Sequence, residues 1–327
     1  QQQDLEQMQK SRDVFVEKNI DDPEVNYLLA MVAYTEKDYE KAEEYLQKIL
    51  NISKSHGPTL LLSGSVSFDK RDFEKAAYYL SKYVVNHPEN NKARRLLGRA
   101  YLALGQNEDA QAEFNTLLNV NPDDAELVAL VGLSEIRSVH VQSGIIDLEK
   151  ALAIAPESSS LKLKLAKVYI TEGQTEKAIK QLDEILEEGG NSLQVNTINV
   201  LAYLQANNTD AAMKIAQQML EESPENPVVL SLVAKVQLVA RDMAAARQYF
   251  EQALSIDAGH IDSALNLARL DEQQGDLESA EKRYLSILDN KPDYTVVMKS
   301  LARLAALKGD AAGQVKWLEA ASKADDK

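Results

Sequence analysis

Residues 94–122 read RRLLGRAYLALGQNEDAQAEFNTLLNVNP, and this stretch decides the fold. It places one small residue, Gly98, in its first half and a second, Ala110, in its second half; Phe114 follows four positions later and Pro122 stands at the end. Two close-packed antiparallel helices can approach only where a small side chain faces the partner helix. Proline ends a helix because it lacks an amide hydrogen and clashes with the preceding turn. The stretch therefore predicts a hairpin of two helices.

The same chemistry recurs every 34 residues along the chain. Repeats begin at Pro23, Gly57, Asn91, Ala125, Ser159, Leu193, Pro227, Ile261 and Thr295. The small residue of the first helix recurs as Ala30, Gly64, Gly98, Gly132, Ala166, Ala234, Ala268 and Ala302, with the larger Val200 in the sixth repeat. That of the second helix recurs as Ala42, Ala76, Ala110, Gly144, Ala178, Ala212, Ala246 and Ala280, with Gln314 in the ninth. A fixed period without insertions indicates a repeat architecture.

The pattern Leu97-Gly98-x2-Tyr101, Ala110-x3-Phe114, Pro122 resembles the tetratricopeptide repeat family, with Arg94 at the family's leading tryptophan. The resemblance covers residues 23–327 and implies an all-α, right-handed superhelical solenoid of nine 34-residue helix-turn-helix repeats. Residues 1–22 contain a further set of apolar residues. We expect them to form an N-terminal helix that packs on the first repeat.

Composition restricts the classes of partner. The net charge of −15 disfavours nucleic acid, since phosphate binding depends on Lys and Arg. The absence of cysteine excludes disulfides and thiolate metal sites. No apolar run approaches the roughly 18 residues of a membrane span, so we expect no direct membrane insertion of these residues.

Catalytic constellations are missing from the sequence. There is no phosphate loop, GxGxxG or GxSxG motif, and the four histidines, His56, His87, His140 and His260, share no helix face at metal-ligand spacing. We therefore expect no metal, no cofactor and no enzymatic activity. The alternative is that the repeats form the targeting or regulatory arm of a larger enzyme.

Stacked hairpins bind partners on an extended concave surface. In the family that this sequence resembles, the first helices line this surface, and the exposed positions are the second, fifth, ninth and twelfth of each repeat. In the first three repeats they predict a partner-binding site formed by Tyr27, Met31, Tyr34, Leu61, Phe68, Lys92, Arg95, Arg99 and Leu102. The last two repeats present Leu265, Arg269, Lys299 and Arg303.

Two interpretations of these residues remain open. The aromatic residues are either a binding anchor, as Tyr often is, or packing for the N-terminal helix. The basic cluster of the third repeat, which includes Arg94, has two interpretations. It either binds an acidic protein or peptide, or it is a solvated helix face. In the fourth repeat β-branched residues around Val139 replace the usual turn. That change is either drift or a specialised contact loop.

Within the family, three stretches resemble bacterial lipoproteins associated with exosortase (PEP-CTERM) sorting systems: residues 38–42, 93–102 and 144–151. This resemblance implies a lipid-anchored chain in the bacterial envelope or periplasm with a role in exopolysaccharide production and protein sorting. The alternative location is the cytoplasm. Trp317 and Leu318, where a regular hairpin would continue, leave open a homodimer formed through the ends of the solenoid.

Overall fold

The computed structural model describes residues 22–325, and within them every regular element is an α-helix. The predicted N-terminal helix lies outside the described residues. The first helices of the nine repeats are α2 Pro23–Thr35, α4 Gly57–Asp69, α6 Asn91–Ala103, α8 Ala125–Arg137, α10 Ser159–Thr171, α12 Leu193–Gln205, α14 Pro227–Val239, α16 Ile261–Gln273 and α18 Thr295–Leu307. The second helices are α3 Tyr39–Ile52, α5 Phe73–Asn86, α7 Asn107–Leu118, α9 Val141–Ile154, α11 Thr175–Glu187, α13 Thr209–Glu222, α15 Met243–Ile256, α17 Leu277–Asn290 and α19 Ala311–Asp325. These helices confirm the all-α fold of nine hairpins.

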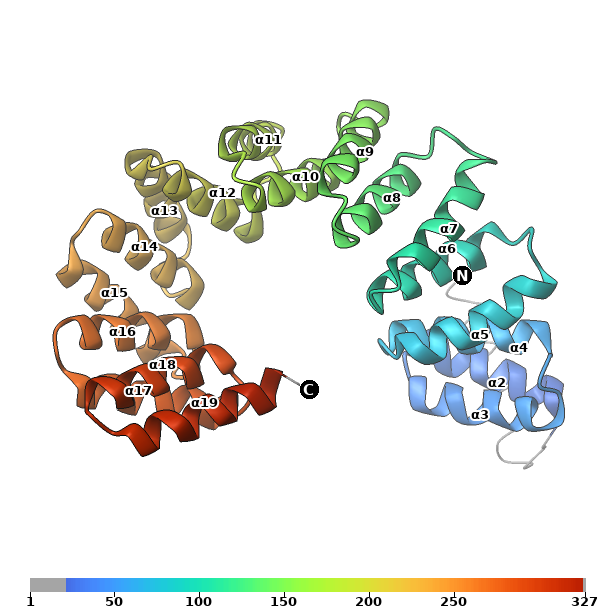
Figure 1. The fold of residues 1–327 in the computed structure, drawn as a ribbon. Helices are drawn as coiled ribbons and strands as arrows, with labels where there is room; N and C mark the ends of the chain where they lie inside the picture. Colours follow the sequence, from blue (N-terminus) through green and yellow to red (C-terminus); the bar gives the residue numbers. More distant parts are fainter. Residues whose placement is uncertain (1–21, 326–327) are drawn as a thin grey trace. The chain divides into compact units, whose positions relative to one another are not determined.

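The chain divides into two compact units after Leu161, within α10. In each unit the packed helices are consecutive in the chain or next but one, so a hairpin contacts its neighbours and little else (Figure 1). This is the nearest-neighbour packing of a repeat protein.

Small residues fill the helix crossings as predicted. The alanines at these positions are at most 2% exposed. At Gly98 an added Cβ would lie 2.5 Å from the ring of Phe114, which shows how tightly the third hairpin closes. The exception at Val200 has a physical reason. The sixth repeat has the small Ala216 where the others have a large residue, and both Val200 and Ala216 are fully buried in one cluster. The two positions have exchanged sizes and the volume is conserved.

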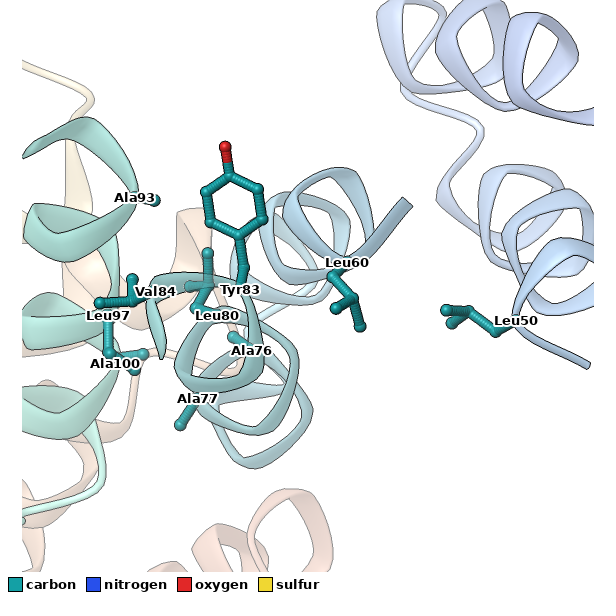
Figure 2. Packing of buried hydrophobic residues seen from close by; sticks show 10 residues of the cluster. All are labelled: Leu50, Leu60, Ala76, Ala77, Leu80, Tyr83, Val84, Ala93, Leu97 and Ala100. Atoms are coloured by element: carbon teal, nitrogen blue, oxygen red, sulfur yellow. The ribbon is translucent and has the colours of Figure 1, made fainter. Parts of the chain in front are cut away.

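Large apolar residues fill the space between hairpins. Figure 2 shows one such cluster, in which Leu80, Tyr83 and Val84 of α5 face Ala93 and Leu97 of α6. The twenty-fourth residue of the repeat is at most 1% exposed in the first eight repeats: Leu46, Leu80, Phe114, Leu148, Leu182, Ala216, Phe250 and Tyr284. In the ninth it is Leu318, which is 48% exposed. The face of α19 that carries Leu318 is therefore uncovered in the described residues.

The turn inside each hairpin has one left-handed residue, always the fifteenth of the repeat. Four are glycines, which take the left-handed conformation at a helix end without steric cost: Gly105, Gly173, Gly275 and Gly309. The other five are Lys37, Arg71, Val139, Asn207 and Arg241. In most repeats the next residue, such as Asp38 or Asp276, caps the second helix by accepting a hydrogen bond from a backbone amide three residues ahead.

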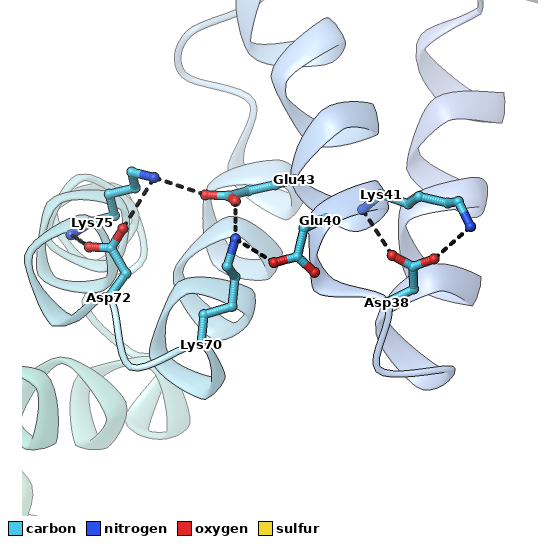
Figure 3. A network of polar contacts seen from close by, with 7 residues as sticks. All are labelled: Asp38, Glu40, Lys41, Glu43, Lys70, Asp72 and Lys75. Carbon is cyan, nitrogen blue, oxygen red and sulfur yellow. Dashed lines mark hydrogen bonds and ion pairs between the residues drawn. The ribbon is translucent and has the colours of Figure 1, made fainter. Parts of the chain in front are cut away.

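Ion pairs join the first repeat to the second (Figure 3). Glu43 of α3 contacts Lys70 Nζ at 2.5 Å and Lys75 Nζ at 3.1 Å, and both lysines belong to the second repeat. Burial raises the pKa of the Glu43 carboxyl, but the hydrogen bonds from the two lysines outweigh it and hold the pKa below its usual value. Glu43 is half-buried and connects the two repeats.

Candidate binding surface

The predicted site residues lie on three first helices of the first unit, α2, α4 and α6. Six of them are half-buried: Tyr27, Met31, Tyr34, Leu61, Phe68 and Arg95. Lys92 and Arg99 are exposed. Leu102 is only 8% exposed and belongs to the core between the third and fourth repeats, so it offers a partner little surface.

Tyr34 is held in place by a contact between repeats. Its hydroxyl donates a hydrogen bond to Asp69 Oδ2 at 2.7 Å, and its ring lies 6.1 Å from that of Tyr39. Burial, and then the hydrogen bond to Asp69 and its charge, raise the pKa of the Tyr34 hydroxyl. The side chain is therefore a neutral donor whose position is fixed before any partner binds.

Tyr27 has an aromatic neighbour of its own. Its ring meets that of His56 edge-on, with centroids 6.3 Å apart. The sequence alone gives no sign of this pair, because the two residues stand at opposite ends of the first repeat. The contact supports neither of the two interpretations of the aromatic residues over the other.

Phe68 contacts both an aromatic residue and a basic residue, although the aromatic and basic residues form separate clusters in the sequence. The ring of Phe73 meets it edge-on at 5.4 Å, and the Arg99 guanidinium lies over it with Cζ 5.4 Å from the centroid. A cation over an aromatic face is attracted by the ring quadrupole. The structure therefore brings an aromatic and a cationic group together across α4 and α6.

Two of the four cations of the third repeat have acidic partners within the chain. Arg94 Nη1 lies 2.5 Å from Glu113, while Arg95 bridges Asp124 at 2.6 Å and Glu126 at 2.8 Å. Burial opposes ionisation of Asp124, but the hydrogen bonds from Arg95 and from the Leu127 amide lower the pKa of its carboxyl. Arg95 thus ties α6 to the start of α8.

Lys92 and Arg99 form no ion pair with any described residue. They are the cations at this surface that remain available to an outside anion. The sequence does not separate them from Arg94 and Arg95, because the acids that occupy those two lie 19 to 31 residues further along. The one signal in the sequence is that Asp124 precedes a repeat start, where a helix N-cap is expected.

The fourth-repeat turn carries an exposed apolar residue. Val139 is 86% exposed with φ +69°, a conformation that a β-branched residue rarely adopts. Arg137, two residues earlier, donates a hydrogen bond to the Leu102 carbonyl oxygen at 2.6 Å, which ties this hairpin to the third repeat. These contacts do not distinguish drift from a specialised loop.

A metal site and a membrane span each have requirements against which the described part of the chain can be compared. Residues 22–325 hold no group of three or more His, Asp or Glu side chains that would suit a metal ion. Among the described helices, none combines the length and hydrophobicity that a bilayer span requires.

Sequence models of the family described as "Tetratricopeptide repeat" match most of the described chain. One matches residues 67–133, 147–198 and 237–308, a second matches 23–56 and a third matches 199–261. No curated protein matches the chain.

Solved structures share the fold at low sequence identity. A tetratricopeptide repeat protein from Parabacteroides merdae is 19% identical with a TM-score of 0.53, over 78% of this chain and 94% of that one. A human IFIT1 dimer with m7Gppp-AAAA is 18% identical with a TM-score of 0.51, over 92% and 77%. The Cut9-Hcn1 hetero-tetramer of APC/C is 16% identical with a TM-score of 0.51, over 93% and 60%. At these identities the likeness is one of fold.

Proposed function

From the premise that the chain belongs to the tetratricopeptide repeat family, we propose that it is a non-catalytic scaffold that binds a protein or peptide through the first helices of repeats one to three. Scaffolds of this fold generally mediate protein–protein interactions on the surface of stacked hairpins.

The contact between Phe68 and Arg99 carries this proposal. It places an exposed cation against an aromatic ring, on the same helix as Lys92 and two repeats from the fixed hydroxyl of Tyr34. Aromatic and arginine side chains dominate binding hot spots, because they combine apolar area with directed polar contacts. In a chain of net charge −15, two cations that form no ion pair within the described residues favour an acidic partner with an aromatic or apolar side chain.

Affinity capture tests the proposal. The bait is the chain itself, compared with a Lys92→Glu, Arg99→Glu double variant in extracts of the source cell. We expect the variant to lose a partner that the unchanged chain retains, with affinity lowered at least ~10-fold, because each reversal replaces a charge-assisted contact by repulsion.

The matched control is Lys37→Glu, Lys54→Glu, which makes the same change in net charge on exposed residues of the first repeat and its following turn. Arg95 is left unchanged, because its reversal would break the pairs with Asp124 and Glu126 and disturb the fold itself. If both double variants lose the partner equally, or if neither loses it, the Lys92–Arg99 surface is ruled out as the binding site.

The alternative of a targeting arm for an enzyme uses the same surface and differs only in what the repeats are attached to. The envelope location and the role in exopolysaccharide and protein sorting rest on the resemblance in three stretches, and they stay predictions. Fractionation of the source cell into envelope, periplasm and cytoplasm would test the location. Recovery in the cytoplasm alone would contradict the predicted envelope location.

Self-association is a second candidate function, favoured by Leu318. Its position is buried in every other repeat, where the following first helix lies beside it, and here it is 48% exposed with Val315 at 55% on the same helix. We propose that two copies pair through this face of α19. An apolar patch at an uncovered helix face marks an interaction surface.

A further inference from the structure

The predicted groove positions of the last two repeats, within the second unit, bring charged residues of both signs together. The twelfth residue of the repeat is apolar in the first seven: Tyr34, Phe68, Leu102, Ile136, Ile170, Leu204 and Leu238. In the eighth it is Glu272, and the ninth residue is arginine in both the eighth and ninth repeats, Arg269 and Arg303. The twelfth residue of the ninth repeat is Ala306, so the eighth repeat alone places a charged group in this apolar series, and each of the two repeats adds an arginine at its ninth position.

Glu272 is fully engaged inside the protein. Its oxygens accept hydrogen bonds from Arg303 Nε at 3.0 Å and Nη2 at 2.8 Å, and one also accepts from the Tyr284 hydroxyl at 3.1 Å. The Glu272 side chain is 11% exposed, while that of Arg303 is 59% exposed. Glu272 thus fixes the Arg303 guanidinium and leaves its remaining N–H groups toward solvent.

The acidic residues of α16 all form ion pairs with basic residues other than Arg269. Asp262 pairs with Lys235 at 2.6 Å. Asp271, which is 2% exposed, pairs with Arg247 and Arg283, both at 2.7 Å. Since Glu272 pairs with Arg303, every carboxylate of α16 has a basic partner, and Arg269 forms no ion pair with the described residues.

An open cavity of about 510 Å³ lies at these residues, lined by Arg269, Glu272, Gln273, Arg303 and Leu307. That volume is within the range of sites that hold a small ligand or a few side chains. Leu307 is 60% exposed, so the cavity has an apolar edge beside its cations.

We propose that this cavity binds a carboxylate of an acidic peptide segment, held by Arg269 and Arg303, with the neighbouring apolar side chain of the peptide on Leu307. The site lies on the second unit and is independent of the surface on repeats one to three. Glu272 lines the cavity and acts as a positioning residue, because both of its oxygens accept hydrogen bonds that orient Arg303. Gln273 offers an amide for a backbone or side-chain hydrogen bond.

The test is fluorescence anisotropy with a labelled peptide of alternating glutamate and leucine, and with a counterpart in which glutamine replaces glutamate. We expect the glutamate peptide to bind more tightly than the glutamine peptide, and its affinity to fall as salt is raised. Arg269→Glu should weaken glutamate-peptide binding at least ~10-fold, in line with the loss of a hydrogen bond to a charged group.

The matched control is Lys282→Glu, an exposed lysine of α17 that has no ion pair in the described residues and lies away from the cavity. It should leave binding unchanged. Absence of binding to the unchanged chain, equal binding of both peptides, or equal weakening by Lys282→Glu would overturn the proposal.

The Lys92→Glu, Arg99→Glu variant separates the two sites. If it alone abolishes peptide binding and Arg269→Glu has no effect, the cavity proposal fails while the surface on repeats one to three stands. If Arg269→Glu alone abolishes binding, the cavity proposal stands and the peptide does not use that first surface. Circular dichroism on each variant checks that the helical content is preserved.

Discussion

Gly132 of α8 and Gly144 of α9 pack backbone against backbone: a Cβ on Gly132 would lie 2.7 Å from the Gly144 carbonyl oxygen, and a Cβ on Gly144 would overlap the Gly132 carbonyl oxygen. At Gly64 and Gly98 the nearest atoms belong to the side chains of Leu80 and Phe114, which can shift. In the fourth hairpin the nearest atom is therefore a backbone oxygen at both glycines, and the side chain of Ile136 also lies 2.5 Å from a Cβ on Gly144.

The first prediction concerns this contact. Gly144→Ala should lower the free energy of unfolding by about 3 kcal/mol, because the added methyl forces α8 and α9 apart, and this outweighs the higher helix propensity of alanine. Urea unfolding followed by circular dichroism measures the change. Gly313→Ala serves as the control, since its Cβ would meet only the side chain of Asp310. A change of under 0.5 kcal/mol in Gly144→Ala, about a twofold change in the equilibrium constant, would contradict the backbone contact.

The second prediction concerns the turn of the same repeat. Val139→Gly should raise the free energy of unfolding by about 1 kcal/mol, because glycine adopts the left-handed conformation without the steric cost that valine meets. Asn207→Gly in the sixth repeat should gain less, since asparagine tolerates that region.

The Val139→Gly variant also separates the two interpretations of the fourth-repeat turn. Unchanged partner capture together with a gain in stability would favour drift. Loss of a partner without loss of stability would show that the exposed valine takes part in binding.

The third prediction is a pH dependence. The folded-state pKa of Asp124 is lowered by its partners, so its contribution to stability is present above the unfolded pKa of ~3.9 and is lost as the pH falls through the folded value. Arg95→Gln should therefore cost about 1 kcal/mol at pH 7, and the difference from the unchanged chain should shrink below pH ~4. Arg99→Gln, which removes no ion pair in the described residues, should show no such dependence. An Arg95→Gln effect that is constant from pH 7 to pH 3 would remove Asp124 as its cause.

The fourth prediction concerns Leu318. Leu318→Glu should abolish concentration-dependent association in light scattering and change the free energy of unfolding by less than ~1 kcal/mol, because the side chain is already half in water. Leu182→Ala, at the same position of the fifth repeat, should instead cost about 2–5 kcal/mol from a buried cavity. A chain that stays monomeric at high concentration would remove the self-association candidate.

The fold was predictable because its signal is periodic. Small residues at fixed offsets and a constant spacing specify each hairpin. The one large exception, Val200, is accommodated in the sixth hairpin because the small Ala216 compensates for its extra volume. Such an exchange is hard to recognise in the sequence, because each of the two residues looks like an isolated exception to the repeat pattern. Only the structure shows that they lie in one cluster.

The candidate site was less predictable, because it depends on which charges are already paired. Arg95 and Arg99 look alike in the sequence, and only the fold shows that one meets Asp124 and the other Phe68. Glu272 raises the same difficulty, because its role as a support for Arg303 follows from a contact 31 residues away. Ion pairs between repeats have no local sequence pattern, while helix packing does.

The neighbour-to-neighbour packing of the helices also affects how the protein folds and unfolds. Since the contacts join helices that are consecutive or next but one, few native interactions require distant parts of the chain to meet. Such a chain can fold rapidly from many starting points and can open one hairpin at a time. Amide hydrogen exchange should therefore reveal a gradient within the second unit, fast in α19, with its uncovered face, and slow in α14, whose residues are among the most deeply buried.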